Sequence, residues 1–228
     1  MQVYSEHPLP HGAALWRSVD SAAGVIAADG CVDLILRDER VLVAGPSTRW
    51  IATLADDEHG SLGLRLPPGT AGPLLQAPLG DLADRLLPLE DVVSVSRARH
   101  LRQQLIGTAA AADAVVGLTA AVVPALDDDA WVARVRGGAR DGVAAHRIAA
   151  DVDQSERTLR RRMRSTFGYG YATLVRIERA ARAQGLLRRG SSPAEAAAIA
   201  GYADQPHLSR EFRRVVGMSP AQFSASVA

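Results

Sequence analysis

The sequence predicts an α+β protein in which a small antiparallel β domain precedes an all-α domain with two helix-turn-helix units. The first observation is a series of short apolar runs separated by turn residues in the first third of the chain. The second is apolar spacing of three and four residues from position 91 onward. The third is a division of charge. We expect a β-rich domain at residues 1–90, a helical linker at 91–128 and a helical domain at 129–228.

The net charge of +1 conceals two oppositely charged halves. Residues 1–128 contain 9 arginines and 16 acidic residues, a balance of −7, whereas residues 129–228 contain 17 arginines and 9 acidic residues, a balance of +8. The chain contains no lysine. A basic second half favours a polyanionic partner such as nucleic acid, and the alternative is a solvated charged face.

The composition excludes other classes of protein. With 47% hydrophobic and 22% charged residues, the chain is too apolar for a disordered protein and too charged for a membrane bundle. The single cysteine, Cys31, allows no internal disulfide, which favours a reducing compartment. The N-terminus lacks the features of a signal peptide. We therefore expect a cytoplasmic protein with no membrane partner.

Turn signals divide the first half into short elements. Strands are expected at residues 31–36, 41–44, 49–54 and 61–66. After a turn at 67–69, apolar residues at helical spacing predict a helix that ends at Pro88, and these are Leu79, Leu82, Ala83, Leu86 and Leu87. A further helix is expected to bury Ala98, Leu101 and Leu105. The uncharged segment 114–126 is shorter than the roughly 20 residues of a membrane span and is expected to be a buried or interface helix.

The basic half contains two segments with one plan. In the first, a short helix at residues 145–150 and a turn at 151–154 lead to Ser155, whose side chain can cap the helix that follows. Leu159 and Met163 lie four residues apart and would face the core. The outer face of that helix is then formed by Arg157, Arg160, Arg161 and Arg164.

In the second segment, Ser192 and Glu195 have the spacing of a capping box, with Pro193 at the first helical position. A turn at residues 201–204 leads to a helix at 205–216. That helix is expected to bury Leu208, Phe212 and Val215 or Val216 and to expose Gln205, His207, Arg210 and Arg214. A short helix, a four-residue turn and a longer polar helix form the layout whose second helix enters the major groove.

At these residues the chain resembles the AraC/XylS family of bacterial transcriptional regulators. The run AGYADQPHLSREFRRVVGMSP at residues 200–220 carries the resemblance, and the first unit matches at Ser155, Arg157, Leu159, Arg161 and Gly168. The resemblance covers about residues 130–226. It implies two helix-turn-helix subdomains joined by a long helix near residues 171–188, each placing a helix in the major groove.

By position, the resemblance assigns DNA contacts to Arg157, Arg160 and Arg161 in the first unit. In the second unit it assigns them to Gln205, His207 and Arg210. Arginine suits guanine and glutamine suits adenine. The remaining arginines, Arg164, Arg213 and Arg214, are expected to bind phosphates. Three residues depart from the family pattern and affect helix entry angles, namely Met163, Gly170 and Pro206.

The N-terminal half looks like a poorly characterised β domain that often precedes such modules. The similarity lies in Trp16, residues 28–35 and residues 63–69. It implies a cupin-like or half-barrel fold with a sensor or dimerisation role, and it names no ligand.

We therefore predict a sequence-specific DNA-binding transcription regulator of the AraC type, with or without effector control, that is not an enzyme. The alternative is a cupin-like ligand-binding protein or enzyme with an accessory DNA-binding tail. Double-stranded DNA is the expected partner, while RNA polymerase, a small-molecule effector and a second copy of the chain stay open. No catalytic residue, metal or cofactor is predicted.

Three kinds of residue in the first half have a structural explanation that we prefer to a functional one. His7, His11 and His59 lack the spacing of a metal site. Cys31 is expected to be a buried small hydrophobe in a strand rather than a redox sensor. Asp29 and Asp33 are expected to be turn-forming or exposed strand residues rather than catalytic carboxylates.

Overall fold

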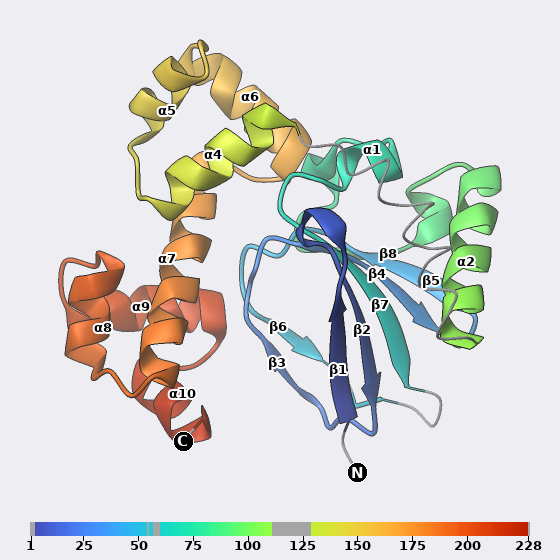
Figure 1. The fold of residues 1–228 in the computed structure, drawn as a ribbon, viewed down its shortest axis with the longest axis horizontal. Coiled ribbons are helices and arrows are strands. Elements are labelled where there is room, and N and C mark those ends of the chain that lie inside the picture. The colour runs from blue at the N-terminus through green and yellow to red at the C-terminus, as the bar shows by residue number, and fades with distance from the viewer. Residues whose placement is uncertain (1–2, 54, 57–59, 111–128, 228) are drawn as a thin grey trace.

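A computed structural model describes residues 3–53, 55–56, 60–110 and 129–227. An antiparallel sheet forms one side of the molecule, and two small helical bodies joined by one long helix form the other (Figure 1). The predicted α+β class, with strands in the first half and helices in the second, is confirmed. Segment 114–126, for which we expected a buried or interface helix, lies outside the described residues.

The main sheet has six strands, and every pair in it is antiparallel. In spatial order they are β1 Val3–Pro8, β2 Ala14–Val19, β7 Ser61–Leu66, β4 Val32–Arg37, β5 Arg40–Ala44 and β8 Leu86–Pro88. A separate two-stranded ribbon consists of β3 Gly24–Ile26 and β6 Ile51–Thr53. Short helical turns are η1 Pro10–Gly12, α1 Gly72–Leu75, η2 Leu79–Asp81 and η3 Leu89–Asp91.

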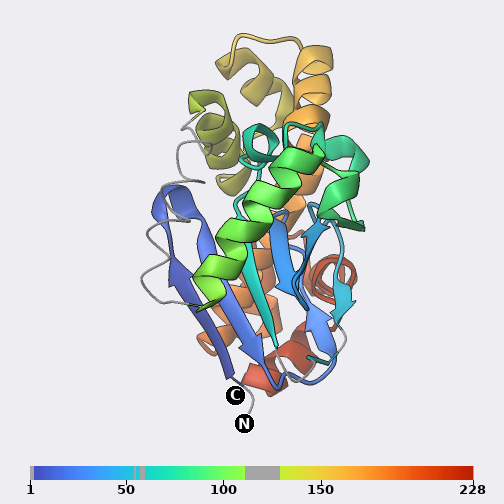
Figure 2. The ribbon, with the colours of Figure 1, turned by 90° about the vertical axis from the view of Figure 1, so that its right-hand side faces the viewer.

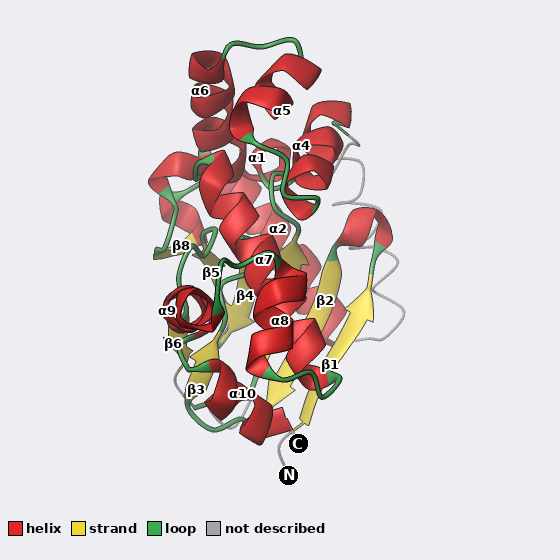
Figure 3. Cartoon of the chain, turned by 90° about the vertical axis from the view of Figure 1, so that its left-hand side faces the viewer, coloured by secondary structure: helices red, strands yellow, loops and turns green. Residues whose placement is uncertain are grey.

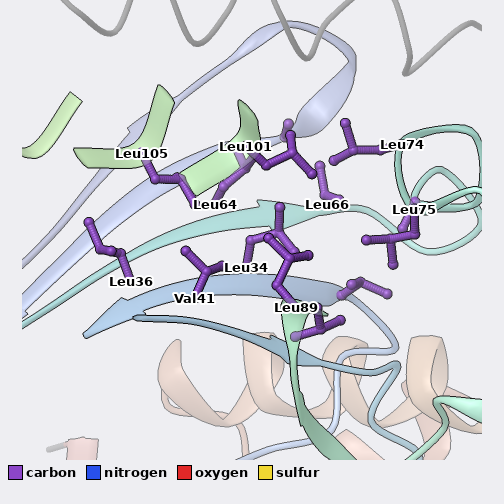
Figure 4. Close-up of a cluster of buried hydrophobic side chains, with 14 of the residues drawn as sticks. Leu34, Leu36, Val41, Leu64, Leu66, Leu74, Leu75, Leu89, Leu101 and Leu105 are labelled. Atoms are coloured by element: carbon purple, nitrogen blue, oxygen red, sulfur yellow. The ribbon is translucent and has the colours of Figure 1, made fainter. Parts of the chain in front are cut away.

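One face of the sheet carries the hydrophobic core. Side chains alternate along a strand, so Val32, Leu34 and Leu36 of β4 are all buried on this face. Helix α2, Val95–Ala110, lies across it and contributes the buried apolar residues Ala98, Leu101 and Leu105, as expected (Figure 4). The helix and sheet together exclude water from a single apolar layer.

The other face of the sheet holds a polar cluster. The indole Nε1 of Trp16 donates to Asp33 Oδ1 at 2.6 Å, and Arg65 Nε lies 3.4 Å from the same oxygen. Burial raises the pKa of Asp33 to about 6. Asp33 is therefore not the exposed strand residue that we expected, because its side chain is only 15% exposed. Asp29 does form a turn, since its Oδ1 accepts from the amide of Cys31.

Cys31 lies one residue before β4 and is half-buried, so it is neither within a strand nor fully buried as we expected. Burial raises the pKa of its thiol well above the ordinary value. The thiolate is the reactive form of cysteine, and raising the pKa disfavours it. This observation argues against a redox role for Cys31.

The prediction of a helix that ends at Pro88 is wrong. Residues Leu79–Asp81 form one turn of 3-10 helix, and Leu86–Pro88 form strand β8, which pairs with β5. Asp84 has a φ of 57°, a left-handed conformation that breaks any helix there. The apolar residues at helical spacing are shared between a turn and an edge strand, which periodicity alone cannot separate.

Seven helices form the described residues 129–227. They are α4 Ala130–Arg140, α5 Ala145–Asp151, α6 Glu156–Phe167, α7 Tyr171–Arg188, α8 Pro193–Ala200, α9 Gln205–Val216 and α10 Pro220–Val227. The long helix α7 belongs to two cores in turn: its first half buries Leu174 and Ile177 with α4 to α6, and its second half buries Ala183 and Leu187 with α8 to α10. The expected layout of two helical units on one connecting helix is confirmed.

None of the helices within residues 3–53, 55–56, 60–110 and 129–227 is both long enough and apolar enough to span a membrane. No cluster of three or more histidine, cysteine, aspartate or glutamate side chains suited to a metal ion occurs in those ranges, and His59 lies outside them.

Candidate nucleic-acid interface

Helix α6 presents the first set of predicted contact residues. Its start is fixed by Ser155, whose Oγ accepts from the amide of Thr158 at 3.2 Å. Leu159, Met163 and Phe167 are buried on one face. The opposite faces carry the exposed side chains Arg157, Arg160, Arg161 and Arg164, as predicted. The helix ends at Gly168, which has a φ of 84°.

Helix α9 presents the second set. The side chain of Asp204 accepts from the amide of His207 at 2.6 Å and caps the helix, and Pro206 occupies its first turn, where a missing amide is tolerated. Leu208, Phe212, Val215 and Val216 are buried. The exposed side chains include Gln205, Arg210, Arg213 and Arg214.

His207 differs from the other predicted contacts because it is part of the turn. Its Nδ1 accepts from the amide of Ala203 at 3.4 Å, and its ring packs edge-on against Tyr202 with centroids 5.3 Å apart. The side chain is half-buried. This arrangement leaves Nε2 as the ring atom that can face a ligand.

The two helices lie on one side of the connecting helix. Figure 3 shows α6 and α9 on the same side of α7, one above the other. Each helix carries exposed arginines away from its buried residues. Two successive contacts with one duplex require one such helix in each unit.

The arginines on these two helices differ in whether they form an ion pair with a carboxylate. Within the described part of the chain, Arg157, Arg161, Arg210 and Arg214 form no ion pair with a carboxylate. Arg162 of the same helix α6 is different, because its guanidinium lies 4.0 Å from the Trp131 ring centroid and 3.0 Å from Asp129. The unpaired arginines are therefore the binding candidates, and Arg162 stabilises the subdomain.

The connection between the two helical bodies is also held by side chains. Arg176 Nε of α7 lies 2.5 Å from Glu211 of α9. The guanidinium of Arg179 lies 5.4 Å from the centroid of the Tyr202 ring. Burial raises the pKa of Tyr202 to about 12, so its phenol stays protonated and neutral beneath the arginine. These contacts fix the second unit against the first half of α7.

The comparisons with known proteins agree with the geometry in this half. Residues 148–226 match a family described as a helix-turn-helix domain. The C-terminal half of the chain carries an AraC-type helix-turn-helix domain. Such domains serve transcription regulation through DNA binding. Residues 14–88 match a second family, described as a domain of unknown function (DUF6597). No curated protein matches the chain.

Three similar solved structures belong to two proteins. The C-terminal domain of AraT, a response regulator from Geobacillus stearothermophilus, is 24% identical, with coverage of 42% of this chain and 84% of that one and a TM-score of 0.40. ToxT from Vibrio cholerae O395 is 11% identical, with coverage of 100% and 98% and a TM-score of 0.47. The same ToxT bound to (E)-4-(8-methylnaphthalen-1-yl)but-3-enoic acid is 12% identical, with coverage of 100% and 99% and a TM-score of 0.48. The assignment of the AraC-type domain depends on the family match and the residues above.

One feature of the interface has no signal in the sequence. The carbonyl groups at the C-terminal end of α9 accept hydrogen bonds from main-chain amides of the N-terminal domain. The amide of Ala28 donates to the carbonyl of Val215 at 2.8 Å, and the amide of Trp50 donates to the carbonyl of Arg214 at 3.4 Å. These pairs join residues more than a hundred positions apart, so no local sequence pattern predicts them. The AraC-type domain is thus in direct contact with the β domain.

Proposed function

We propose that this protein is a sequence-specific transcription regulator that inserts α6 and α9 into two successive major-groove segments of one duplex. The observation that carries the proposal is the pair of capped helices on one side of α7, each with exposed and unpaired arginines. An arginine fork can donate two hydrogen bonds to O6 and N7 of guanine.

The position of each residue along its helix suggests its role. Residues in the first half of a recognition helix reach the base edges. Arg157 and Arg161 of α6, with Gln205 and Arg210 of α9, are therefore proposed to contact bases, together with Arg160 and the free nitrogen of His207. The last turns carry Arg164, Arg213 and Arg214, which are proposed to bind phosphates and hold the protein in register.

The remaining parts of the chain are proposed to serve regulation. Residues 1–90 would form the sensor or oligomerisation domain, 91–128 the helical linker and 129–228 the DNA-binding domain. A small-molecule effector, RNA polymerase and a second copy of the chain are the proposed partners besides DNA. Regulators of the AraC type are in general not enzymes, and we propose a regulatory, non-catalytic role in the bacterial cytoplasm.

The test is selection of duplexes from a random library by the full-length protein, followed by footprinting on the enriched sequence. We expect enrichment of one motif and two protected segments centred about one helical turn, or roughly 34 Å, apart. Affinity for the motif should exceed affinity for scrambled DNA at the same salt concentration, because base contacts add to the phosphate contacts. Equal affinity for both duplexes would contradict the proposal.

A further inference from the structure

Both recognition helices end against the N-terminal domain in the same way. Helix α6 ends at Gly168 and helix α9 at Gly217, with φ values of 84° and 86°. A Cβ on Gly168 would lie 2.7 Å from Cγ of Pro46. A Cβ on Gly217 would lie 3.0 Å from Cγ of Trp50 and 2.7 Å from Cγ1 of Val25. Each glycine therefore meets two needs, a left-handed φ and a close approach by the β domain.

Pro46 and Trp50 belong to one short segment, residues 45–50, which we call the bridging loop. Its first half touches the end of α6, and its last residue touches the end of α9. The contact at α9 includes a main-chain hydrogen bond, from the amide of Trp50 to the carbonyl of Arg214. Figure 2 shows the β3–β6 ribbon, which continues from this loop, beside α9 seen end-on.

The bridging loop is held firmly from both sides. Asp84 accepts from the amide of Thr48 at 2.7 Å and from its hydroxyl at 2.6 Å, and the amide of Asp84 donates to the carbonyl of Pro46 at 3.1 Å. On the other side, the carbonyl of Ser47 accepts from the amide of Gly30 at 3.2 Å. A loop with main-chain hydrogen bonds at several points transmits displacement rather than absorbing it.

Further contacts support the attachment at α6. The Tyr169 hydroxyl donates to the carbonyl of Gly30 at 3.3 Å. A Cβ on Gly80 would lie 3.1 Å from the carbonyl oxygen of Arg164, and a Cβ on Gly69 would lie 2.8 Å from the Phe167 ring. The first helical unit is therefore packed against the β domain over several segments.

We propose that the bridging loop positions the two recognition helices relative to each other, so that the N-terminal domain sets the DNA spacing the protein accepts. This inference rests on the proposed function. Without the loop, α7 is the covalent connection between the two units, and small bending or twisting of one helix moves α9 relative to α6. The bridging loop adds a second connection, at the C-terminal ends of α6 and α9. Pro46 and Trp50 are therefore positioning residues that act through Gly168 and Gly217.

The experiment compares full-length Trp50→Ala with wild type on the duplex enriched from a random library. Trp50 is 40% exposed, so truncation should leave the fold intact, and Val95→Ala removes an exposed apolar side chain at the start of α2 as the control. Each protein is titrated against the selected duplex and against versions with one base pair added or removed between the two protected segments. Circular dichroism verifies folding.

We expect wild type and Val95→Ala to discriminate against the altered spacings by about tenfold or more, because the second helix then misses its groove by about 3.4 Å and 35°. Trp50→Ala should reduce that ratio to about threefold while keeping much of its affinity for the original spacing. An unchanged ratio in Trp50→Ala would overturn the inference. If wild type itself selects no motif, that result contradicts the proposed function rather than the role of the bridging loop.

A second measurement needs no DNA. Spin labels at Arg157→Cys and Gln205→Cys, in a Cys31→Ser background, report the distance between the starts of α6 and α9 in the full-length protein. We expect one narrow distance distribution with the intact loop and a clearly broader one after Pro46→Ala together with Trp50→Ala. Equal widths would contradict a positioning role, whatever the DNA affinity.

Discussion

At the scale of single residues, neighbouring arginines of α6 differ in what they can do. Arg161 is exposed and unpaired with any described carboxylate, whereas the next residue, Arg162, stacks on Trp131 and reaches Asp129 at 3.0 Å. A guanidinium already engaged by a ring and a carboxylate stabilises the fold. An unengaged one on the outer face is available to DNA. The two residues therefore make a matched pair for mutation.

Arg161→Ala and Arg210→Ala are each expected to weaken binding to the selected motif by about 1–3 kcal/mol and to relax base preference at one position. The reason is the loss of a two-pronged contact with a base edge on the outer face of each helix. Titration against a panel of singly substituted duplexes measures both effects. Arg162→Ala is the control, expected to lower the melting temperature and keep the base preference. Wild-type selectivity in both test variants would contradict the assignment.

Asp33 is expected to make stability depend on pH. Burial raises its pKa to about 6 in the folded state, against 3.8 as its ordinary value. The folded protein then holds a proton that the unfolded chain releases, so the stabilisation is complete below pH 3.8 and is lost as pH rises through 6. The loss amounts to at most about 3 kcal/mol.

The measurement is urea unfolding of wild type and Asp33→Asn between pH 4 and pH 7. We expect the free energy of unfolding of wild type to fall relative to that of the variant as pH rises, since asparagine does not titrate. Asp91→Asn, a change at an exposed residue, is the control and should run parallel to wild type. Parallel curves for Asp33→Asn as well would show that its carboxyl does not titrate in this range.

At the scale of secondary structure elements, helix starts in the second half are fixed by local hydrogen bonds. Ser192 and Glu195 form the predicted capping box: Ser192 Oγ accepts from the amide of Glu195 at 3.3 Å, and the Glu195 carboxylate accepts from the amide of Ser192 at 2.8 Å. The amide and the hydroxyl of Ser192 both donate to the Glu195 carboxylate, and these bonds lower its pKa. The start of α8 is therefore set by four consecutive residues.

Ser192→Ala is expected to cost about 1 kcal/mol of unfolding free energy, because an orphan amide at the start of α8 loses its acceptor. Thermal and urea unfolding of the full-length protein measure the change. Ser191→Ala, one residue earlier, is the control and should have a smaller effect. If the two variants unfold alike, the cap contributes nothing beyond ordinary helix propensity.

The bounds of α8 and α9 agree with the sequence prediction because their signals are local, whereas the bounds of α7 agree with those that the family resemblance implied. Caps, prolines in the first turn and buried residues spaced three and four apart all act within one helix. The exposed arginines of the candidate site follow from the same periodicity, since a residue opposite a buried stripe is on the surface. For this reason the sequence predicts the exposed arginine faces of α6 and α9 well.

The first half was predicted less completely because its structure depends on distant pairing. Strands β1 and β8 lie at the edges of the main sheet and β3 in the separate ribbon, and none of them carries a clear local pattern. Whether residues 79–88 form a helix or a turn and strand depends on Asp84 bonding to Thr48 and on pairing with β5. The bridging loop depends on contacts across the whole chain. No pattern within ten residues can encode such contacts.

At the scale of the whole molecule, the opposite charges of the two halves do not explain how they meet. The described contacts between them are hydrogen bonds to main-chain carbonyls and apolar packing, such as Ala28 to Val215, Tyr169 to Gly30 and Pro46 beside Gly168. Within the described residues, no ion pair joins the two halves. The positive charge of the AraC-type domain therefore stays available for DNA, and salt should weaken binding in proportion to the phosphates contacted.

We propose that one chain places α6 and α9 in successive major-groove segments on one face of the duplex. The most direct test is insertion of five base pairs between the two protected segments of the selected duplex, which turns them to opposite faces. We predict that the full-length protein loses one of its two footprints and binds at least about tenfold more weakly, because one helix can no longer reach its groove. Unchanged affinity with both footprints retained would contradict simultaneous docking of the two helices.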